Sequence, residues 1–390
     1  MTFALHSSLH VATMRRAKQN AIHDWAAALP TNNVVTRQLQ RSCHALREFD
    51  RTTALNTTSI SFARGEAVSC YGCSRPCHRT HPVYVFSCQT CGERFQKLRH
   101  LTRDMTARVA LVVGARTKLG HQVVIKMLED GATVVGTTRF PAEAFALYEQ
   151  YADWPRWRDR LRFFPESLDL DTPELGATAA RLRDFVATVG GGALDVLVAC
   201  AAQTIRAREK ERPQKQAGDD ENRYGDPRHV ATDCVNSWHM RLGDVMQREM
   251  EEVFRINAVA PAILLQQLAP LLRHSVVAPY VIHVHAREGL FDVDKGDSHV
   301  HTNMAKAALA MLTKCVSNND QLRTTAGVPI RVHGCDPGWI SVDEYYEEDR
   351  PWRVPPLDEV DGAARVLFPL FKNIAGSCRK TRRHFCHLTY

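Results

Sequence analysis

The chain has 390 residues, of which 44% are hydrophobic, and its formal net charge is +7. This length allows one large α/β domain and a smaller module. No apolar run approaches the roughly 18 residues of a membrane-spanning helix, and the positive charge is spread along the chain. We therefore expect neither a membrane protein nor a nucleic-acid-binding protein.

Residues 1–65 carry no pattern of a hydrophobic core and are predicted to be an N-terminal extension, partly disordered or a targeting segment. Its beginning contains Arg15, Arg16 and Lys18 but no acidic residue up to His23. That composition is typical of an organellar transit peptide, but a plain N-terminal tail has it too. A mitochondrial and a cytoplasmic location therefore both stay open.

Four cysteines form two close pairs in the next segment, residues 66–104. Cys70 and Cys73, followed by Cys88 and Cys91, give the spacing C-x₂-C-x₁₄-C-x₂-C. Each pair can place two thiolates on one turn of backbone, and two such pairs close a tetrahedral zinc site with no open position. The spacing predicts a small module held together by a structural zinc. The alternative is a set of unrelated free thiols.

Three other potential ligands, Cys77, His78 and His81, lie between the two pairs. Any of them could replace one cysteine, although we interpret them as bystanders. Gly92 is expected to supply the positive φ that a metal-binding knuckle often needs. The remaining cysteines are scattered singly, which indicates a reducing compartment. The module is expected either to dock on the next domain or to hold a protein partner.

A strand–turn–helix–strand pattern opens a predicted nucleotide-binding domain that covers residues 105–390. An apolar run, Val109 to Val113, ends at Gly114, and Gly120 then leads into an amphipathic helix. A second apolar run follows at Thr133 to Gly136. Glycines in such a turn let the backbone approach a pyrophosphate, whose charge the start of the helix stabilises. A turn that needs its glycines only for packing is the alternative.

Basic side chains in and after this turn bear on the choice of dinucleotide. Lys118 stands where related turns have a middle glycine. Lys118 and Arg116 could contact phosphate, although a lysine also removes the narrow approach that glycine gives. Arg139 follows the second strand, next to Thr138, at the position of a 2′-phosphate. An arginine there favours NADP over NAD, and a solvated strand-end arginine is the alternative.

Strands and helices continue to alternate, which predicts a parallel sheet with right-handed crossovers, a Rossmann-type doubly wound α/β fold preceded by the zinc module. Residues 205–232 interrupt the pattern with charged and polar residues and are predicted to be a disordered insertion. Further strands are expected at Leu161 to Leu170, Leu194 to Ala199, Tyr280 to His285 and Ile330 to Cys335. Helices are expected at Glu174 to Val189, around Val253 to Leu264 with a kink at Pro261, and at His299 to Ser317.

The order of these parts resembles the short-chain dehydrogenase/reductase superfamily, from about Ala107 to Leu370. The resemblance implies hydride transfer between an NAD(P)(H) cofactor and a carbonyl or alcohol, a small-molecule substrate of unknown identity, and a homo-oligomer. Asp169-Leu170 resembles the pair beside the adenine, and Pro337-Gly338 resembles the turn at the nicotinamide carboxamide. The implied cofactor-binding residues are Gly114, Arg116, Thr117, Lys118, Leu119, Gly120, Thr138, Arg139, Asp169, Leu170, Ala201, Lys306, Pro337, Gly338 and Ile340.

The implied catalytic residues are Asn257, Lys306, Thr302 and His285. The asparagine and the lysine match the family, whereas Thr302 and His285 stand where its pattern is lost. Thr302 stands where the family has its tyrosine proton donor, and an aliphatic hydroxyl is a much weaker acid than a phenol, whose pKa is about 10. The serine of the family is also absent, and His285 follows the corresponding strand. A replacement acid is then required. His285 and His301 are the candidates because an imidazole titrates near neutral pH; a solvated or core histidine is the alternative for each.

Two functions remain open at this point. One is an NAD(P)(H)-dependent oxidoreductase with a degenerate catalytic triad. The other is a catalytically inactive NAD(P)-binding pseudoenzyme that acts as a scaffold or cofactor sensor through its zinc module. Both require a dinucleotide, preferably NADP, but only the enzyme oxidises it.

Overall fold

The computed structural model describes residues 67–84, 86–203, 237–319, 322–340, 356–374 and 385–386. The predicted N-terminal extension at 1–65 and the predicted insertion at 205–232 lie outside these residues. Among the described helices, none combines the length and hydropathy that crossing a membrane requires.

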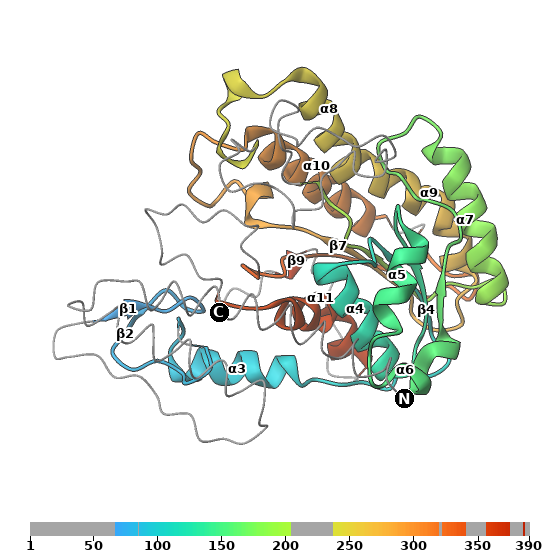
Figure 1. Ribbon diagram of the computed structural model, residues 1–390, viewed down its shortest axis with the longest axis horizontal. Helices are drawn as coiled ribbons and strands as arrows, with labels where there is room; N and C mark the ends of the chain where they lie inside the picture. The colour runs from blue at the N-terminus through green and yellow to red at the C-terminus, as the bar shows by residue number, and fades with distance from the viewer. Residues whose placement is uncertain are drawn as a thin grey trace.

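A parallel sheet of seven strands forms the centre of the fold (Figure 1). The strands are β3 (Val109–Val113), β4 (Thr133–Thr137), β5 (Leu161–Phe163), β6 (Val196–Ala199), β7 (Tyr280–Val284), β8 (Arg331–Cys335) and β9 (Phe385–Cys386). Their order in the sheet is β5-β4-β3-β6-β7-β8-β9, with a reversal between β3 and β6. The chain thus builds outward from β3 in both directions, which is the order of a doubly wound Rossmann fold and confirms the predicted fold class.

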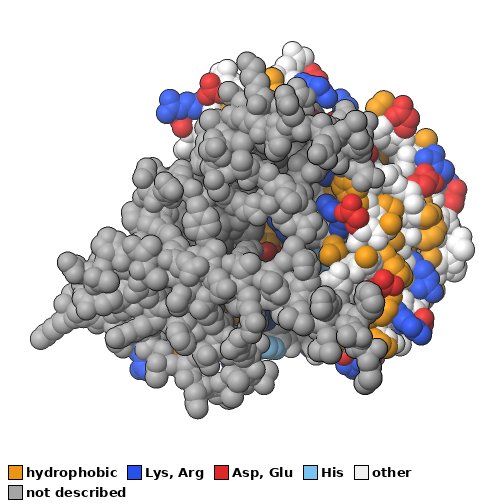
Figure 2. Space-filling view, viewed as in Figure 1, with side chains coloured by type: hydrophobic (Ala, Val, Ile, Leu, Met, Phe, Trp, Pro, Cys, Tyr) orange, Lys and Arg blue, Asp and Glu red, His pale blue; other side chains and the backbone are white. Residues whose placement is uncertain are grey.

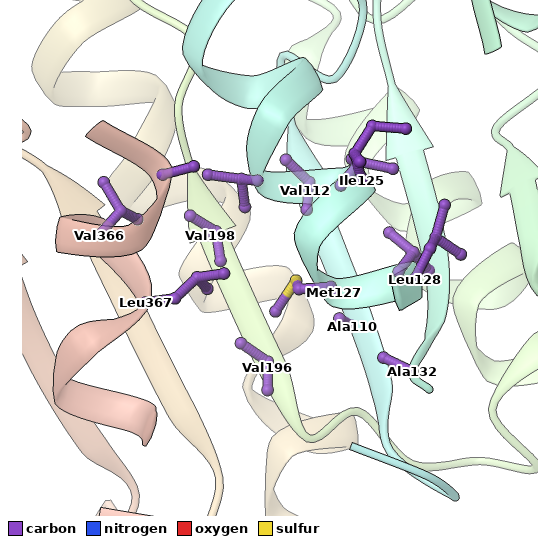
Figure 3. Packing of buried hydrophobic residues seen from close by; sticks show 14 of the residues in the cluster. Ala110, Val112, Ile125, Met127, Leu128, Ala132, Val196, Val198, Val366 and Leu367 are labelled. Carbon is purple, nitrogen blue, oxygen red and sulfur yellow. The ribbon is translucent and has the colours of Figure 1, made fainter. Parts of the chain in front are cut away.

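Helices cover both faces of the sheet because successive strand side chains point to opposite faces. They are α4 (Lys118–Glu129), α5 (Pro141–Tyr148), α6 (Trp154–Trp157), α7 (Leu175–Val189), α8 (Gln247–Phe254), α9 (Ala260–Arg273), α10 (Val300–Ser317) and α11 (Glu359–Ile374). On β3, Ala110 and Val112 face a layer with α4 and α11, whereas Leu111 and Val113 face a layer with α7 and α9. Figure 3 shows Leu367 of α11 and Met127 of α4 beside Val198.

Two predicted elements differ in their extent. β5 ends at Phe163 and not at Leu170, because Pro165 lacks the N–H that a strand ladder needs. The predicted kinked helix is divided into α8, a π-helical segment (Arg255–Val259) and α9. Pro261 explains this division, since it cannot donate a hydrogen bond to the carbonyl four residues before it and its ring opens that turn.

The cysteine-rich segment folds as a small module against the end of the main domain. It consists of a two-stranded antiparallel sheet, β1 (Val68–Ser69) and β2 (Pro76–Cys77), and helix α3 (Gln89–Arg99). Figure 1 shows α3 running alongside α11. The module therefore docks on the following domain, which is the first of the two roles that the sequence left open.

Basic and acidic side chains are interspersed on the described part of the surface in Figure 2. On and near α7, for example, Arg181 pairs with Glu166 and Arg183 pairs with Asp184. This mixture agrees with the even distribution of charge along the sequence.

Helix α11 is expected to be essential for stability. Leu367 is 0% exposed and lies in the core between α4 and the sheet. The substitution Leu367→Ala should lower the free energy of unfolding by about 2–5 kcal/mol, because it removes buried methyl groups and leaves a cavity. Met311→Ala, at a side chain that is 55% exposed, should change it by less than about 0.5 kcal/mol. Equal urea unfolding midpoints for the two variants would contradict this assignment of the core.

Candidate functional site

The turn between β3 and α4 closes so tightly that it requires both of its glycines. Gly114 has a φ of +86°, and a Cβ there would lie 2.8 Å from the Cα of Ala201. A Cβ on Gly120 would lie 2.0 Å from the carbonyl oxygen of Gly114. The turn therefore brings Gly114, Gly120 and Ala201 together at the carboxyl end of the sheet, at the point where the strand order reverses. Dinucleotides bind at this position in doubly wound sheets.

Lys118 does not block this turn. Its φ of +52° is in the left-handed region that glycine favours, and its side chain is exposed at the first position of α4. Thr117 precedes it in an extended conformation. Leu119 packs instead against α11, where a Cβ on Gly362 would lie 3.0 Å from the Cδ1 of Leu119.

Two arginines lie at the end of β4, around Phe140. The Arg139 guanidinium is 5.4 Å from the centre of the Phe140 ring, and that of Arg116 is 4.6 Å from it. Arg116 also donates a 2.6 Å hydrogen bond to Glu143. The buried Thr138 hydroxyl accepts a hydrogen bond from the Phe140 N–H at 3.2 Å. Two guanidinium groups thus lie near the same aromatic ring at the end of β4.

Lys306 is a buried cation at the same edge of the sheet. Its Nζ donates a 3.0 Å hydrogen bond to the carbonyl oxygen of Val284, the last residue of β7. Burial lowers its pKa to about 8, against the attraction of the Glu288 and Asp336 carboxylates. A lysine with this pKa is still largely protonated at pH 7, so the site holds a poorly solvated positive charge.

Cys200 and Asp336 are site residues that the sequence analysis did not identify. Cys200 follows β6, and a Cβ on Gly120 would lie 3.3 Å from its Cβ. Burial raises the pKa of its thiol to about 12. Asp336 follows β8 and accepts a 2.8 Å hydrogen bond from the Gly338 N–H. Both residues stand at the carboxyl ends of central strands, which is the signal that could have found them.

The turn at Pro337 and Gly338 lies at the other side of this edge. Gly338 has a φ of +83°. Ile340 follows the turn, and a Cβ on Gly362 would lie 3.1 Å from two of its side-chain carbons. Because Leu119 contacts the same glycine, helix α11 joins the glycine-rich turn to the Pro337–Gly338 turn.

Asn257 and Thr302 have closed surroundings. The Asn257 side chain makes two hydrogen bonds of 2.7 Å to the backbone of Gln203, accepting from its N–H and donating to its carbonyl oxygen. Thr302 is fully buried, and its hydroxyl has no hydrogen-bond partner among the described residues. Both positions suit packing at least as well as proton transfer.

His285 belongs to a buried hydrogen-bonded group that also contains His283 and Thr313. The Thr313 hydroxyl lies 2.8 Å from Nδ1 of His283 and 3.0 Å from Nε2 of His285, and it donates to the carbonyl oxygen of Leu309 at 2.8 Å. Because its single proton goes to Leu309, the hydroxyl must accept from both rings. Nε2 of His285 therefore carries a proton. Nothing in the local sequence identifies His283 or Thr313 as members of this group.

His301 is placed differently. It is buried in α10, with its Nε2 3.9 Å from Oε1 of Glu249, which is too far for a hydrogen bond. Burial lowers its pKa to about 4. The ring is therefore neutral at pH 7, and the geometric pairing with Glu249 is not an ion pair.

Asp169 and Leu170 lie in the loop after β5. The Asp169 carboxylate accepts a 2.9 Å hydrogen bond from the Asp171 N–H, and Leu170 is buried. Asp169 lines a cavity of about 590 Å³ together with both acidic and basic side chains, among them Glu251 and Arg255. Asp169 is thus close to open space beside the end of the sheet.

The four cysteines of the module come together. The sulfur atoms of Cys70, Cys73, Cys88 and Cys91 all lie within 4.8 Å of one another. A tetrahedral zinc with bonds of about 2.3 Å spaces its sulfurs about 3.8 Å apart, so the donor set fits this ion.

The neighbouring residues of the module have structural roles. The Cys77 thiol donates to the carbonyl oxygen of Arg79, and Nδ1 of His81 accepts from two backbone N–H groups. The prediction for Gly92 is wrong, because Gly92 lies inside α3 and the positive φ, +57°, belongs to Ser74. A Cβ on Gly92 would lie 2.2 Å from the His81 ring, so close packing is what requires this glycine.

No family model matches the sequence. An uncharacterised protein of Acanthamoeba polyphaga mimivirus, R665, is 33% identical over an alignment of 347 positions that covers 80% of this chain and 73% of R665. The C-signal protein of Myxococcus xanthus is 31% identical over 126 residues, 32% of this chain and 70% of its own.

Solved structures share the fold at low identity. A short chain dehydrogenase from Salmonella enterica aligns with a TM-score of 0.51 and 16% identity over 72% of this chain and 96% of its own. A protein of the short chain dehydrogenase class from Escherichia coli, solved in complex with NADPH, aligns with a TM-score of 0.50 and 16% identity over 71% of this chain and 92% of its own. The main domain therefore has the short-chain dehydrogenase fold.

The buried charge of Lys306 is expected to appear in the pH dependence of stability. Its pKa is about 8 in the folded protein against an ordinary value of 10.5, so between these values the unfolded chain binds more protons and stability rises with pH. Relative to Lys306→Met, the native chain should gain up to about 3 kcal/mol across this window. Lys314→Met, which removes an exposed lysine from the same helix, should follow the native profile in urea unfolding. A Lys306→Met profile parallel to the native one would contradict the buried charge.

Proposed function

The chain belongs to the family of the mimivirus protein R665 and has the fold of the short-chain dehydrogenases, and on this basis we propose that it is an NADP(H)-dependent oxidoreductase. Its substrate would be the carbonyl or alcohol group of a small molecule. The observation that carries the proposal is the meeting of three features at one edge of the sheet. These are the turn in which Gly114 and Gly120 have no room for a Cβ, the buried ammonium of Lys306, and the turn at Pro337 and Gly338.

NADP(H) fits the residues at this edge. The glycine turn and the N-terminus of α4 would hold the pyrophosphate, since neither glycine has room for a Cβ and helix N-termini stabilise anions. Arg139 and Arg116 would hold the 2′-phosphate, and Lys306 the nicotinamide ribose. The NADPH bound to the Escherichia coli protein of the same fold supports this choice. When bound, the cofactor would supply the hydride.

The remaining task of the chain is to move a proton, which we assign to His285. It directly follows Val284, whose carbonyl oxygen binds Lys306, so the imidazole and the ammonium are attached to the same strand end. The hydrogen bond from Nε2 to Thr313 fixes the orientation of the ring, so the proton would be delivered from Nδ1 of the doubly protonated imidazole, which becomes neutral. His301 is the weaker candidate because burial holds its pKa at about 4.

A catalytically inactive NADP(H)-binding protein is the second candidate function. Two observations favour it: the buried hydroxyl of Thr302 at the position of the tyrosine, and the two hydrogen bonds that occupy the Asn257 side chain. Such a protein would bind NADPH through the same residues without oxidising it.

For the cysteine cluster we propose a structural zinc. The four sulfurs fill a tetrahedral coordination sphere, which leaves no position for a substrate or an activated water. The main contribution of the metal would be to the stability of a module that is too small to bury a large core.

Gly120→Ala tests the dinucleotide site. Its Cβ would overlap the carbonyl oxygen of Gly114, so NADPH affinity, measured by the fluorescence of the bound cofactor, should fall by at least about tenfold, because misplaced backbone donors no longer face the phosphates. Gly176→Ala, the same substitution inside α7, meets no atom within 4 Å and should leave affinity unchanged. Circular dichroism separates lost binding from unfolding. A folded Gly120→Ala variant with native affinity would contradict the site.

His285→Gln tests the assignment of the proton donor. Glutamine keeps an N–H for Thr313 but cannot deliver a proton, so NADPH oxidation with a panel of aldehydes, ketones and quinones should slow by about 10²- to 10⁴-fold at unchanged NADPH affinity. His301→Gln should change the rate only slightly. If the native protein binds NADPH but oxidises it with no substrate of the panel, the inactive alternative is favoured; equal rates for native protein and His285→Gln would exclude His285 as the donor.

A further inference from the structure

The cysteine module touches the proposed dinucleotide site directly through Tyr71. This residue lies between the two cysteines of the first pair, in Cys70-Tyr-Gly-Cys73. Its hydroxyl oxygen accepts a 2.9 Å hydrogen bond from the backbone N–H of Trp339. Burial raises the pKa of the phenol, so the hydroxyl stays protonated near neutral pH. The side chain of Tyr71 therefore connects the Cys70–Cys73 pair directly to the turn that the proposed function places beside the nicotinamide.

The Tyr71 hydroxyl lies where a side chain at position 338 would have to start. A Cβ on Gly338 would lie 2.9 Å from the Tyr71 oxygen and 2.8 Å from Cδ1 of Leu357. The backbone of the turn is thus held from two sides, by Asp336 at the Gly338 N–H and by Tyr71 at the Trp339 N–H. A turn with a positive φ and two such bonds has little freedom to change its conformation.

The core of the module includes residues of the main domain. Leu357 is buried in the same cluster as Cys70, Cys91 and Phe95, and Ile340 packs against that cluster. Ile340 and Leu357 flank residues 341–355, which lie outside the described part of the chain. The module therefore holds the chain on both sides of the segment that follows the Pro337–Gly338 turn.

Polar contacts anchor the module to the start of α11. Arg99 lies 2.6 Å from Asp358 and 3.0 Å from Asp361, and its side chain is only 16% exposed. The Tyr84 hydroxyl donates a 2.7 Å hydrogen bond to Asp361. Partly buried contacts of this kind fix the orientation of two packed elements, because breaking one leaves a poorly solvated charge. A change of shape in the module would therefore be transmitted to α11 and to the Pro337–Gly338 turn.

From these contacts we infer that the cysteine module is a metal-dependent clamp on the nicotinamide end of the dinucleotide site, and that Tyr71 is its positioning residue. The inference rests on the proposed function and gives the zinc module a role within it. Without a metal, no metal–sulfur bonds would join the Cys70–Cys73 pair to the Cys88–Cys91 pair. Tyr71 would then be held by the small core of the module and by the hydrogen bond from its N–H to Phe86, and its position against the turn would loosen. Metal occupancy then sets the affinity for NADPH. By linkage, NADPH raises the affinity for the metal by the same factor.

Tyr71→Phe in the full-length, zinc-loaded protein tests the clamp. Loss of one hydrogen bond to the turn should weaken NADPH binding by about three- to tenfold. Binding of 2′-phospho-ADP-ribose, which lacks the nicotinamide, should not change, whereas a general loss of structure would weaken both ligands. Ser69→Ala is the matched control, because it removes an exposed hydroxyl from the same module, one that bonds the carbonyl oxygen of Ser74 and neither α11 nor the turn. It should leave both affinities native.

Removal of the metal is the second test of the clamp. The native chain should contain one zinc per molecule, and stripping it under reducing conditions should lower NADPH affinity more than Tyr71→Phe does. Saturating NADPH should slow the transfer of zinc to a chromogenic chelator in the native chain, and less so in Tyr71→Phe.

The outcomes separate the clamp from the proposed function. Native NADPH affinity in both the stripped protein and Tyr71→Phe would overturn the clamp alone. Failure of the zinc-loaded native protein to bind NADPH would overturn the proposed function and the clamp with it.

Discussion

The fold depends on the close approach of the backbone at Gly114 and Gly120. The ends of β3 and β6 and the start of α4 meet where a single added methyl group would overlap a carbonyl oxygen. No side chain fits at this contact. The groups best placed to face a ligand there are therefore the backbone N–H groups at the start of α4, where the strand order reverses. In the proposed function this turn would hold the elongated anion, and the side chains around it would set the selectivity.

Those side chains divide into a charged part and a hydrogen-bonded part. Arg116 and Arg139 supply positive charge at one end, and Lys306 supplies a buried ammonium near the centre. Behind it, His285 and His283 share the Thr313 hydroxyl, which orients both rings. Burial makes each of these groups sensitive to the presence of a charged ligand, because few water molecules compete with it. The same burial raises the pKa of Cys200 to about 12 and removes its thiol from nucleophilic chemistry near pH 7.

Features set by local sequence could be predicted, and features set by distant contacts could not. The strand and glycine pattern before α4 and the spacing of the four cysteines predicted the fold class and the cysteine cluster correctly, since each depends on neighbouring residues. The assignment of catalytic residues remains a prediction. The contact of Tyr71 with Trp339 joins residues 268 positions apart, and the packing of Gly92 on the His81 ring depends on how the module folds. The extent of β5 is different, because Pro165 is a local signal that the prediction did not use. Helix α11 does show helical spacing in Ala363, Val366, Leu367 and Leu370, but only the structure reveals that it joins the module to both turns.

Hydrogen–deuterium exchange of the zinc-loaded protein, with and without saturating NADPH, tests the central claim most directly. We predict slower exchange in peptides that cover the turn from Gly114 to Gly120 and the turn from Asp336 to Ile340, with only the first protected by 2′-phospho-ADP-ribose. Unchanged exchange in both turns when NADPH is bound, or protection confined to other parts of the chain, would contradict it.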